Sequence, residues 1–364
     1  MSQKKIYYSI IIPGYRLDIK NQEDLVEEIG KTYGYDNVPG CLPLLQQKEI
    51  LIDKNQFYRD LIRQKLSNLG YREIITYSLI SKEEDNDDYF FLEGDKVYKL
   101  LSPKSENCVC YRRSLLPSHL KTIAYNLMRQ NENLFFFEIS KIYSLTSKGA
   151  REEEILALSG TGKIMSNSVH RLESDYDFFW LKGVIEGIFI ALNINDRISF
   201  VPSQMKKLHP YQGADILLNQ RKIGFAGQIH PQIRKIYQIN QPVFGTQISL
   251  SKLFFFLAKD SQWSYQIISP FPKIEQDLSF YLTEGILASK VTEIIKKNGN
   301  SLLKEVRIFD AYQSKEDKEN QKKSLAFRLT FQSQEKTLQK PEVDKIIQKI
   351  IEQVQILLGA KLKV

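Results

Sequence analysis

Residues 325–331 read Leu-Ala-Phe-Arg-Leu-Thr-Phe, and this stretch decides the fold of the last quarter of the chain. Apolar residues at every second position predict a β-strand. A very polar loop at 313–323 precedes it, and helices are predicted at 288–298, where Gly299 follows, and at 341–357. Further strands are predicted at 278–282, 306–312 and 360–364. The order β-α-β-β-α-β predicts a ferredoxin-like domain over residues 269–364.

Upstream of this domain, residues from about 50 to 262 predict an α+β domain with long antiparallel strands. Asn219-Gln220 is expected to form the turn of a hairpin. Glu138 is the one carboxylate in an apolar strand at 134–143, so we expect it to pair structurally. Near the start of the chain, Ser9 to Ile12 predicts a short strand, and a helix begins at about Asn21, its N-cap. Arg72 to Ile80 alternates like a strand.

The composition is that of a globular protein with a basic balance. The 364 residues are 42% hydrophobic and 26% charged, and the net charge is +8. Excess positive charge favours a polyanionic partner such as nucleic acid, although a lysine-rich inert surface has the same composition. Three cysteines provide no disulfide framework, and no stretch is long enough to span a membrane. We therefore expect a reducing, cytoplasmic location.

Four carboxylates lie close together in the N-terminal segment: Asp18, Asp24, Glu27 and Glu28. The last three are spaced i, i+3 and i+4, so they share one face of the predicted helix, and Asp18 can reach its first turn. Converging carboxylates repel unless a cation neutralises them, and magnesium prefers a few carboxylate oxygens with water. The spacing alone favours the plainer alternative, a solvated acidic turn that complements the helix dipole.

The C-terminal domain combines aromatic and basic residues. From Ser269 on, it holds 17 basic and 13 acidic residues, a balance of +4. Single-stranded RNA suits such a surface, because splayed bases stack on rings and phosphates pair with cations. Tyr312 is a candidate for stacking a base and Asp310 for contacting a guanine edge. Lys323, Ser324 and Arg328 are candidates for holding RNA backbone or base. The alternative is an aromatic core beside a solvated lysine loop.

The sequence contains no motif for independent catalysis. It has no Walker loop, no GxGxxG and no HxxxH, and its serines and cysteines have no obvious activating partner. We therefore assign no catalytic residue to this chain.

Motifs along nearly the whole chain resemble those of the β chains of bacterial phenylalanyl-tRNA synthetases, in the family's order. In the N-terminal part they are Pro13–Ile19, Asp24–Ile29 and Tyr33–Pro39. In the middle they are Leu69–Ser78, Arg113–Pro117, Phe137–Ile139, Leu208–Pro210, Gly224–Gly227 and Ile229–Pro231. Near the C-terminus they are Phe271–Pro272, Asp277–Ser279, Phe309–Tyr312 and Lys323–Phe331.

The resemblance implies an α+β protein of three parts. Residues 1–46 would be a partial preceding domain, a winged-helix-like remnant with the acidic site. Residues 47–262 would form a class II aminoacyl-tRNA synthetase-like antiparallel core that has lost catalysis, and residues 269–364 the ferredoxin-fold anticodon-binding domain. Where active class II domains carry a glycine-rich strand leading to an arginine, Val243 to Ser251 has one glycine and no arginine. A phosphate clamp for ATP is therefore absent.

The resemblance also implies partners and a cofactor. The active site, with its ATP, would lie on a separate α subunit in an α2β2 heterotetramer that phenylalanylates tRNA(Phe). In the family, the acids matching Asp18, Asp24, Glu27 and Glu28 bind Mg²⁺ near the α chain, which raises the metal interpretation above the plain acidic turn.

The chain departs from the family at some positions. Gly14-Tyr15 stands where Ser-Trp is usual, and Gln276 where Arg is frequent. A full β chain also carries N-terminal tRNA-binding and editing domains, whereas this chain begins inside the signature that follows them. We therefore expect a reduced subunit or a C-terminal portion, and we assign it no proofreading of tyrosyl-tRNA. One alternative is a stand-alone RNA-binding or regulatory paralogue without ligase function. A second alternative is an independent ligase, and the missing arginine argues against it.

Overall fold

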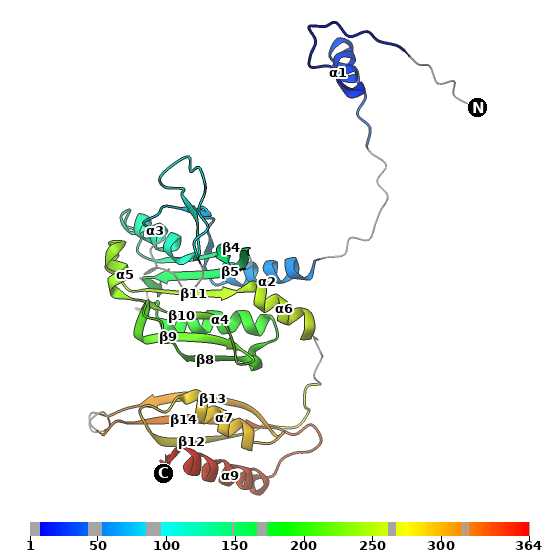
Figure 1. The fold of residues 1–364 in the computed structure, drawn as a ribbon. Coiled ribbons are helices and arrows are strands. Elements are labelled where there is room, and N and C mark those ends of the chain that lie inside the picture. Colours follow the sequence, from blue (N-terminus) through cyan, green and yellow to red (C-terminus); the bar gives the residue numbers. More distant parts are fainter. Residues whose placement is uncertain are drawn as a thin grey trace, which may run out of the picture. The chain divides into compact units, whose positions relative to one another are not determined.

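The computed structural model describes residues 8–42, 53–84, 96–147, 149–165, 173–260, 267–314, 317 and 320–363. The chain divides into two compact units, residues 1–261 and 262–364, each described by itself below. Helices and mainly antiparallel sheets make up both units, so the fold is mixed α+β (Figure 1). Within the described ranges, no helix is both long and apolar enough to cross a membrane.

The first unit is built on a seven-stranded sheet in which every neighbouring pair is antiparallel except β1–β4. At the turn between two of its strands, Asn219 and Gln220 both have positive φ, 46° and 67°, which confirms the predicted hairpin. In spatial order the strands are β1 (Arg72–Glu73), β4 (Leu134–Thr146), β5 (Gly149–Thr161), β11 (Val243–Ser249), β10 (Arg221–Ile229), β9 (Leu208–Leu218) and β8 (Ile198–Pro202).

Helices pack on both faces of this sheet. On one face, an apolar cluster that includes Phe137 holds α2 (Lys54–Asn68), α4 (Phe178–Ala191) and α6 (Leu250–Asp260). On the other face, a cluster that includes Phe136 holds α3 (Leu116–Leu127) and α5 (Pro231–Ile236). Phe136 and Phe137 serve opposite faces because successive side chains of a strand alternate. The smaller elements are β2 (Leu79–Ile80), β3 (Cys110–Tyr111), β6 (Lys163–Met165), β7 (Ser174–Asp175) and the 3-10 turn Asn195–Arg197.

Glu138 is buried in β4 and pairs structurally, as predicted. Its carboxylate accepts hydrogen bonds from Arg112 Nη2 at 3.0 Å and from Thr76 Oγ1 at 2.7 Å, and His119 Nε2 lies 3.5 Å from it. Burial by itself raises the pKa of Glu138, but His119, Arg112 and Thr76 more than offset this, and its pKa is lowered. This network ties β4 to α3, to the segment between β1 and β2, and to the residue directly after β3.

Two predicted strands of the first unit are wrong in part. Residues 9–12 form no strand, and residues 72–80 form only β1 and β2, separated by irregular backbone. The predicted helix at Asn21 is confirmed as α1 (Gln22–Tyr33), with Asn21 as its N-cap and the 3-10 turn Tyr35–Asn37 after it. A strand needs a ladder partner, and no strand in the described part of the chain pairs with residues 9–12.

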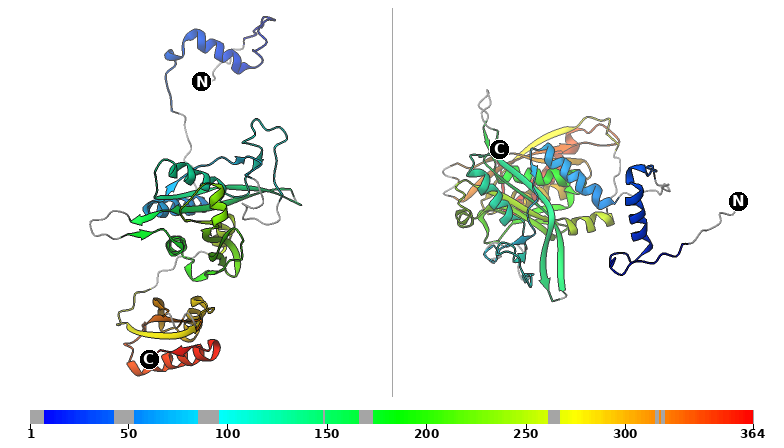
Figure 2. Two further views of the ribbon diagram at one scale, coloured as in Figure 1. Left: turned by 90° about the vertical axis from the view of Figure 1, so that its left-hand side faces the viewer. Right: turned by 90° about the horizontal axis from the view of Figure 1, so that it is seen from above.

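The second unit confirms the predicted ferredoxin-like order. Its antiparallel sheet runs β13 (Leu303–Tyr312), β14 (Lys322–Phe331), β12 (Ile274–Thr283), β15 (Lys361–Leu362). The helices α7 (Ala288–Asn298) and α9 (Lys340–Leu358) pack on one face of this sheet, and the left view of Figure 2 shows α9, in red, lying along it. Leu325, Phe327, Leu329 and Phe331, the alternating residues of β14, are all buried against these helices.

Candidate nucleic-acid interface

The face of the four-stranded sheet opposite α7 and α9, called the outer face below, brings together residues from three strands. Pairing across the strands places Asp310 opposite Ala326, Tyr312 opposite Ser324, and Arg328 opposite Asp277. Directly paired residues of antiparallel strands point to the same side of a sheet. The outer face is therefore formed by Asp277, Ser279 and Tyr281 of β12, Arg307, Phe309, Asp310 and Tyr312 of β13, and Ser324, Ala326 and Arg328 of β14.

A register shift in β13 sets the direction of the Phe309 and Asp310 side chains. Ile308 pairs with Phe327 and Asp310 with Ala326, so Phe309 is an extra residue in the ladder. Such a bulge bends the strand and re-aims side chains. Consequently the half-exposed ring of Phe309 lies beside Arg328, whose guanidinium carbon is 5.1 Å from the ring centre. Asp310 and Tyr312 follow on the same face.

Four of the five predicted RNA contacts therefore share this face: Asp310, Tyr312, Ser324 and Arg328. The ring of Tyr312 is 55% exposed, enough to accept a base on its surface. Ser324 is buried, and its hydroxyl lies 3.2 Å from that of Ser279.

Arg328 is engaged by a carboxylate of the same face. Its Nε and Nη2 donate to the two carboxylate oxygens of Asp277, each at 2.8 Å. This two-point pair raises the pKa of Arg328 and lowers that of Asp277. A phosphate approaching Arg328 has to compete with Asp277.

Lys323 lies apart from the other predicted contacts. Its strand position pairs with Leu282, whose side chain is buried in the core of the unit, and its Nζ donates to the carbonyl oxygen of Glu284 at 2.7 Å. Burial lowers its pKa. The sequence could not separate it from Ser324, because adjacent residues of a strand point to opposite faces.

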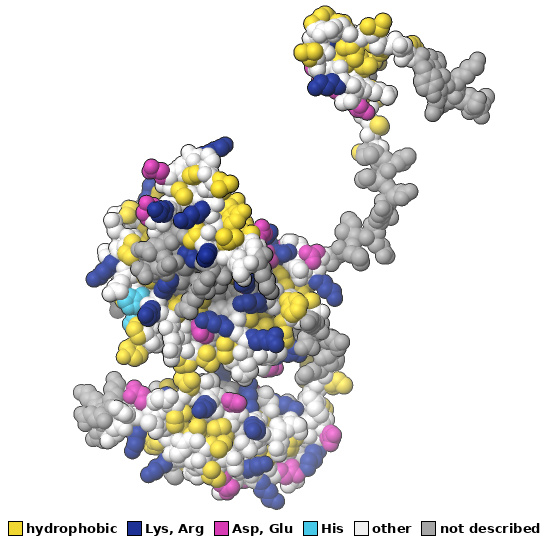
Figure 3. All heavy atoms as spheres, viewed as in Figure 1, with side chains coloured by type: hydrophobic (Ala, Val, Ile, Leu, Met, Phe, Trp, Pro, Cys, Tyr) yellow, Lys and Arg dark blue, Asp and Glu magenta, His cyan; other side chains and the backbone are white. Residues whose placement is uncertain are grey.

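Sequence reasoning missed several outer-face residues and one neighbour. Three of these residues, Asp277, Ser279 and Tyr281, lie on β12, and the neighbour is Lys363, whose ammonium nitrogen lies near the rings of Tyr281 and Tyr312. Their strands are far from β13 in sequence, so only the pairing of strands reveals them. On the side of this unit seen in Figure 3, lysine and arginine side chains are scattered among acidic and apolar ones.

The four N-terminal acids are engaged by cations and backbone groups. Arg16 Nη2 lies 2.7 Å from Asp18 and 2.9 Å from Glu28. The hydrogen bond from Arg16 lowers the pKa of Asp18 to about 2.

The remaining two acids of this segment have partners of their own. Lys31 Nζ is 2.7 Å from Glu27, and Asp24 accepts hydrogen bonds from the backbone amides of Lys20 and Asn21, which lower its pKa. Among the described residues, no group of three His, Cys, Asp or Glu is placed to hold a metal ion. This arrangement does not fit a magnesium site, because the four carboxylates face Arg16, Lys31 and backbone amides rather than one another. Magnesium binding there stays a prediction.

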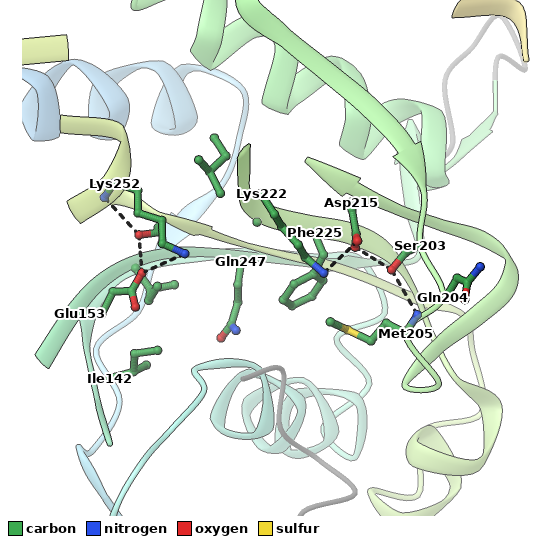
Figure 4. A pocket seen from close by; sticks show the side chains of 14 residues that line it. Ile142, Glu153, Ser203, Gln204, Met205, Asp215, Lys222, Phe225, Gln247 and Lys252 are labelled. Carbon is green, nitrogen blue, oxygen red and sulfur yellow. Dashed lines mark hydrogen bonds and ion pairs between the residues drawn. The ribbon is translucent and has the colours of Figure 1, made fainter. Parts of the chain in front are cut away.

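A cavity of about 380 Å³ opens against the large sheet of the first unit (Figure 4). Its two carboxylates and two lysines face each other in pairs. Lys222 Nζ lies 2.9 Å from Asp215, and Lys252 Nζ lies 3.9 Å from Glu153. Glu153 also accepts a 2.5 Å hydrogen bond from Ser249. Arg151, outside the lining, is the closer partner of Glu153, at 2.6 Å.

Known families match each part of the chain. A model of the phenylalanyl tRNA synthetase beta chain CLM domain matches residues 38–250, more than half of the chain. A ferredoxin-fold anticodon binding domain matches residues 269–363, and a tRNA synthetase B5 domain matches residues 2–35. A solved pyrrolysyl-tRNA synthetase from Desulfitobacterium hafniense aligns at 16% identity over 56% of this chain and 70% of its own, with a TM-score of 0.44, too low to establish a shared fold.

Relatives along the whole sequence carry one name, phenylalanine–tRNA ligase beta subunit. That of Bacillus cereus is 34% identical over 98% of this chain and 44% of its own length. Those of Bacillus subtilis and Staphylococcus epidermidis are 33% and 31% identical over 94% of this chain and 42% of their own lengths. The chain thus spans less than half the length of these curated relatives. From its domains and their order, the chain belongs to the phenylalanyl-tRNA synthetase beta chain family.

Proposed function

We propose that this chain is the β subunit of a phenylalanine–tRNA ligase, or its C-terminal portion, and works in the cytoplasm. It binds the anticodon region of tRNA(Phe) and supports a catalytic α subunit, with which it forms an α2β2 heterotetramer. The ATP-dependent chemistry takes place on the α subunit. The observation that carries the proposal is the convergence of Asp310, Tyr312, Ser324 and Arg328 on the outer face, in a domain that matches an anticodon-binding family.

Each of these residues has a role set by its chemistry. Tyr312 offers a half-exposed ring on which an unpaired base stacks. Asp310 is an acceptor beside that ring and suits the donor edge of guanine. Arg328 moves from Asp277 to a phosphate, exchanging one charge-assisted pair for another. Ser324 is buried, and its hydroxyl, which both donates and accepts, lies 3.2 Å from that of Ser279, so it is the least accessible of the four.

We propose that residues 47–262 form a class II synthetase-like core without catalysis. The mainly antiparallel sheet with helices on both faces is compatible with this. A synthetase active site has to stabilise the negative charge of a phosphate group. In the cavity on this sheet, Lys222 is already paired with Asp215, while Lys252 lies 3.9 Å from Glu153, which Arg151 engages at 2.6 Å. The two lysines of the lining are matched by two carboxylates, so the cavity offers an anionic transition state little net positive charge.

The test is co-expression with an α chain from the same source. Phenylalanylation of tRNA(Phe) is measured for the mixture and for each chain alone, and the mass of the complex is measured in solution. We expect charging only in the mixture and a mass of two copies of each chain.

The other outcomes point to other functions. If the mixture forms a soluble complex that does not charge tRNA, the chain is insufficient as a subunit. If no complex forms but the lone chain binds tRNA, a stand-alone RNA-binding protein replaces the proposal. If the lone chain exchanges pyrophosphate into ATP, it is itself a ligase.

A further inference from the structure

Two tyrosines stand on either side of Ser324 on the outer face, and the function proposed above uses only one of them. Tyr281 of β12 and Tyr312 of β13 both pair directly with Ser324 of β14. Their side chains therefore point to the same side of the sheet. Since they are two strands apart, their backbones are separated by roughly 10 Å. This is too far for the two rings to stack on each other.

A cation lies between the two rings. The ammonium nitrogen of Lys363 is 5.2 Å from the ring centre of Tyr281 and 5.4 Å from that of Tyr312. Lys363 follows β15, which pairs with β12, and its backbone amide donates to Ser279 at 2.8 Å. The main chain therefore fixes where this lysine leaves the sheet, and its ammonium group is within cation–π range of both rings.

A hollow borders the first of these rings. It has a volume of about 300 Å³ and is lined by Tyr281, Leu282, Thr283, Asp317, Lys322, Gly359 and Lys361. Two lysines in this lining give the hollow a positive side. The surface beyond Tyr281 thus suits a nucleotide, with an aromatic ring for the base and ammonium groups for a phosphate.

We propose that Tyr281 is a second base-stacking platform. It holds the base next to the one on Tyr312, and Lys363 contacts the phosphate that joins the two nucleotides. Sheets that carry aromatic rings on two strands of one open face take successive bases of single-stranded RNA in this way. The phosphate between two bases on these rings passes over Lys363, which then exchanges two cation–π contacts for an ion pair. This inference rests on the proposed function, since it needs the outer face to bind an RNA loop.

The test uses the full chain and the anticodon stem-loop of tRNA(Phe). Tyr281→Val removes the ring and keeps a residue suited to a strand. Tyr281→Phe keeps the ring, and Tyr211→Val removes an exposed tyrosine from the other unit. We expect Tyr281→Val to weaken binding by about 5- to 150-fold, the range for one stacked base. Tyr281→Phe and Tyr211→Val should bind like the unchanged chain.

Stem-loops with one abasic nucleotide identify the base that each ring holds. When the base held by Tyr281 is missing, Tyr281→Val should cause no further loss of affinity, while Tyr312→Val should still weaken binding. When the neighbouring base is missing, Tyr312→Val should cause no further loss and Tyr281→Val should still weaken binding. If both substitutions lose their effect at the same abasic position, the two rings hold one base and the inference is overturned. It is also overturned if Tyr281→Val binds as well as Tyr211→Val.

The same measurements distinguish a failure of this inference from a failure of the proposed anticodon binding. Loss on Tyr312→Val without loss on Tyr281→Val removes only the second platform, whereas loss on neither removes both proposals. If Tyr281→Val fails to fold, Lys363→Gln replaces it. Removing one phosphate contact to a single strand should make the slope of log affinity against log salt shallower by about 0.7. An unchanged slope would overturn the role of Lys363.

Discussion

Arg328 and Asp277 face each other across β14 and β12, and two hydrogen bonds of 2.8 Å join the guanidinium to the carboxylate. Both side chains are 45% exposed, so this pair lies in solvent at the surface proposed to bind RNA. An exposed pair of this kind contributes little to stability. The pair has a larger effect on RNA binding, because Asp277 accepts the hydrogen bonds that Arg328 would otherwise donate to a phosphate.

Replacing Asp277 by Asn should therefore strengthen RNA binding. The change removes a competitor for Arg328, and we expect affinity for the anticodon stem-loop to rise by roughly two- to fivefold. Glu352→Gln is the matched control, since it makes the same charge change at an exposed position of α9. Equal gains in both variants would mean that net charge alone, and not release of Arg328, explains the increase.

Tyr312 should contribute a stacking interaction. Tyr312→Ala removes the ring and should cost about 1–3 kcal/mol of binding free energy. Tyr312→Phe keeps the ring and should retain most of the affinity. Binding is measured by titration of a labelled stem-loop, with thermal unfolding as the check on folding. Unchanged affinity of Tyr312→Ala would remove this ring from the interface.

Lys323 and Arg328 should differ in their contribution to RNA binding, although the sequence placed them together. The ammonium group of Lys323 donates to the carbonyl of Glu284, away from the outer face. We expect Lys323→Gln to change affinity less than about twofold, and Arg328→Gln to weaken it more and to make the salt dependence shallower. A larger loss for Lys323→Gln would place the RNA path over the start of β14 instead.

Glu138 should be one of the most sensitive positions for stability. Its carboxylate is buried with Arg112, and removing one partner of a buried pair leaves the other charge unpaired. Glu138→Ala should lower the free energy of unfolding by about 3–5 kcal/mol, measured by urea denaturation. Replacing both residues by apolar ones, Arg112→Met with Glu138→Leu, should cost less. If the double variant is less stable than the single one, the hydrogen bonds of the pair matter more than its uncompensated charge.

Arg16 should control the acidic N-terminal segment. Because the folded-state pKa of Asp18 is lowered to about 2 from an ordinary 3.8, its pair with Arg16 is complete above about pH 4 and is lost as the pH falls through 2. An NMR titration of the Asp18 carboxyl should show this midpoint, and Arg16→Gln should move it upward toward 3.8. Mg²⁺ titration of both forms of the full chain tests the metal prediction directly. Binding by the unchanged chain with Asp18, Asp24, Glu27 and Glu28 as ligands would require Arg16 to move away from these acids.

Much of the second unit could be predicted because its signals are local. The helix at 288–298 was predicted with its observed bounds, and the alternating residues of β14 are buried as their period requires. The turn at Asn219-Gln220 was also correct, since asparagine tolerates the positive φ that a tight hairpin needs. In contrast, residues 72–80 alternate in the sequence but form two short strands, because a strand needs a partner that sequence alternation does not supply.

The sequence by itself determined the order of elements and the residue types of the RNA-binding candidates, since periodicity, caps and turns act over a few residues. Only the tertiary structure decided which of those residues meet. The bulge at Phe309 places Asp310 opposite Ala326 and Tyr312 opposite Ser324, while Lys323 lies on the other side of β14. Tyr281 joins the face from a strand more than thirty residues away. Register between distant strands fixes such contacts, and a shift of one residue would move every side chain of a strand to the opposite face.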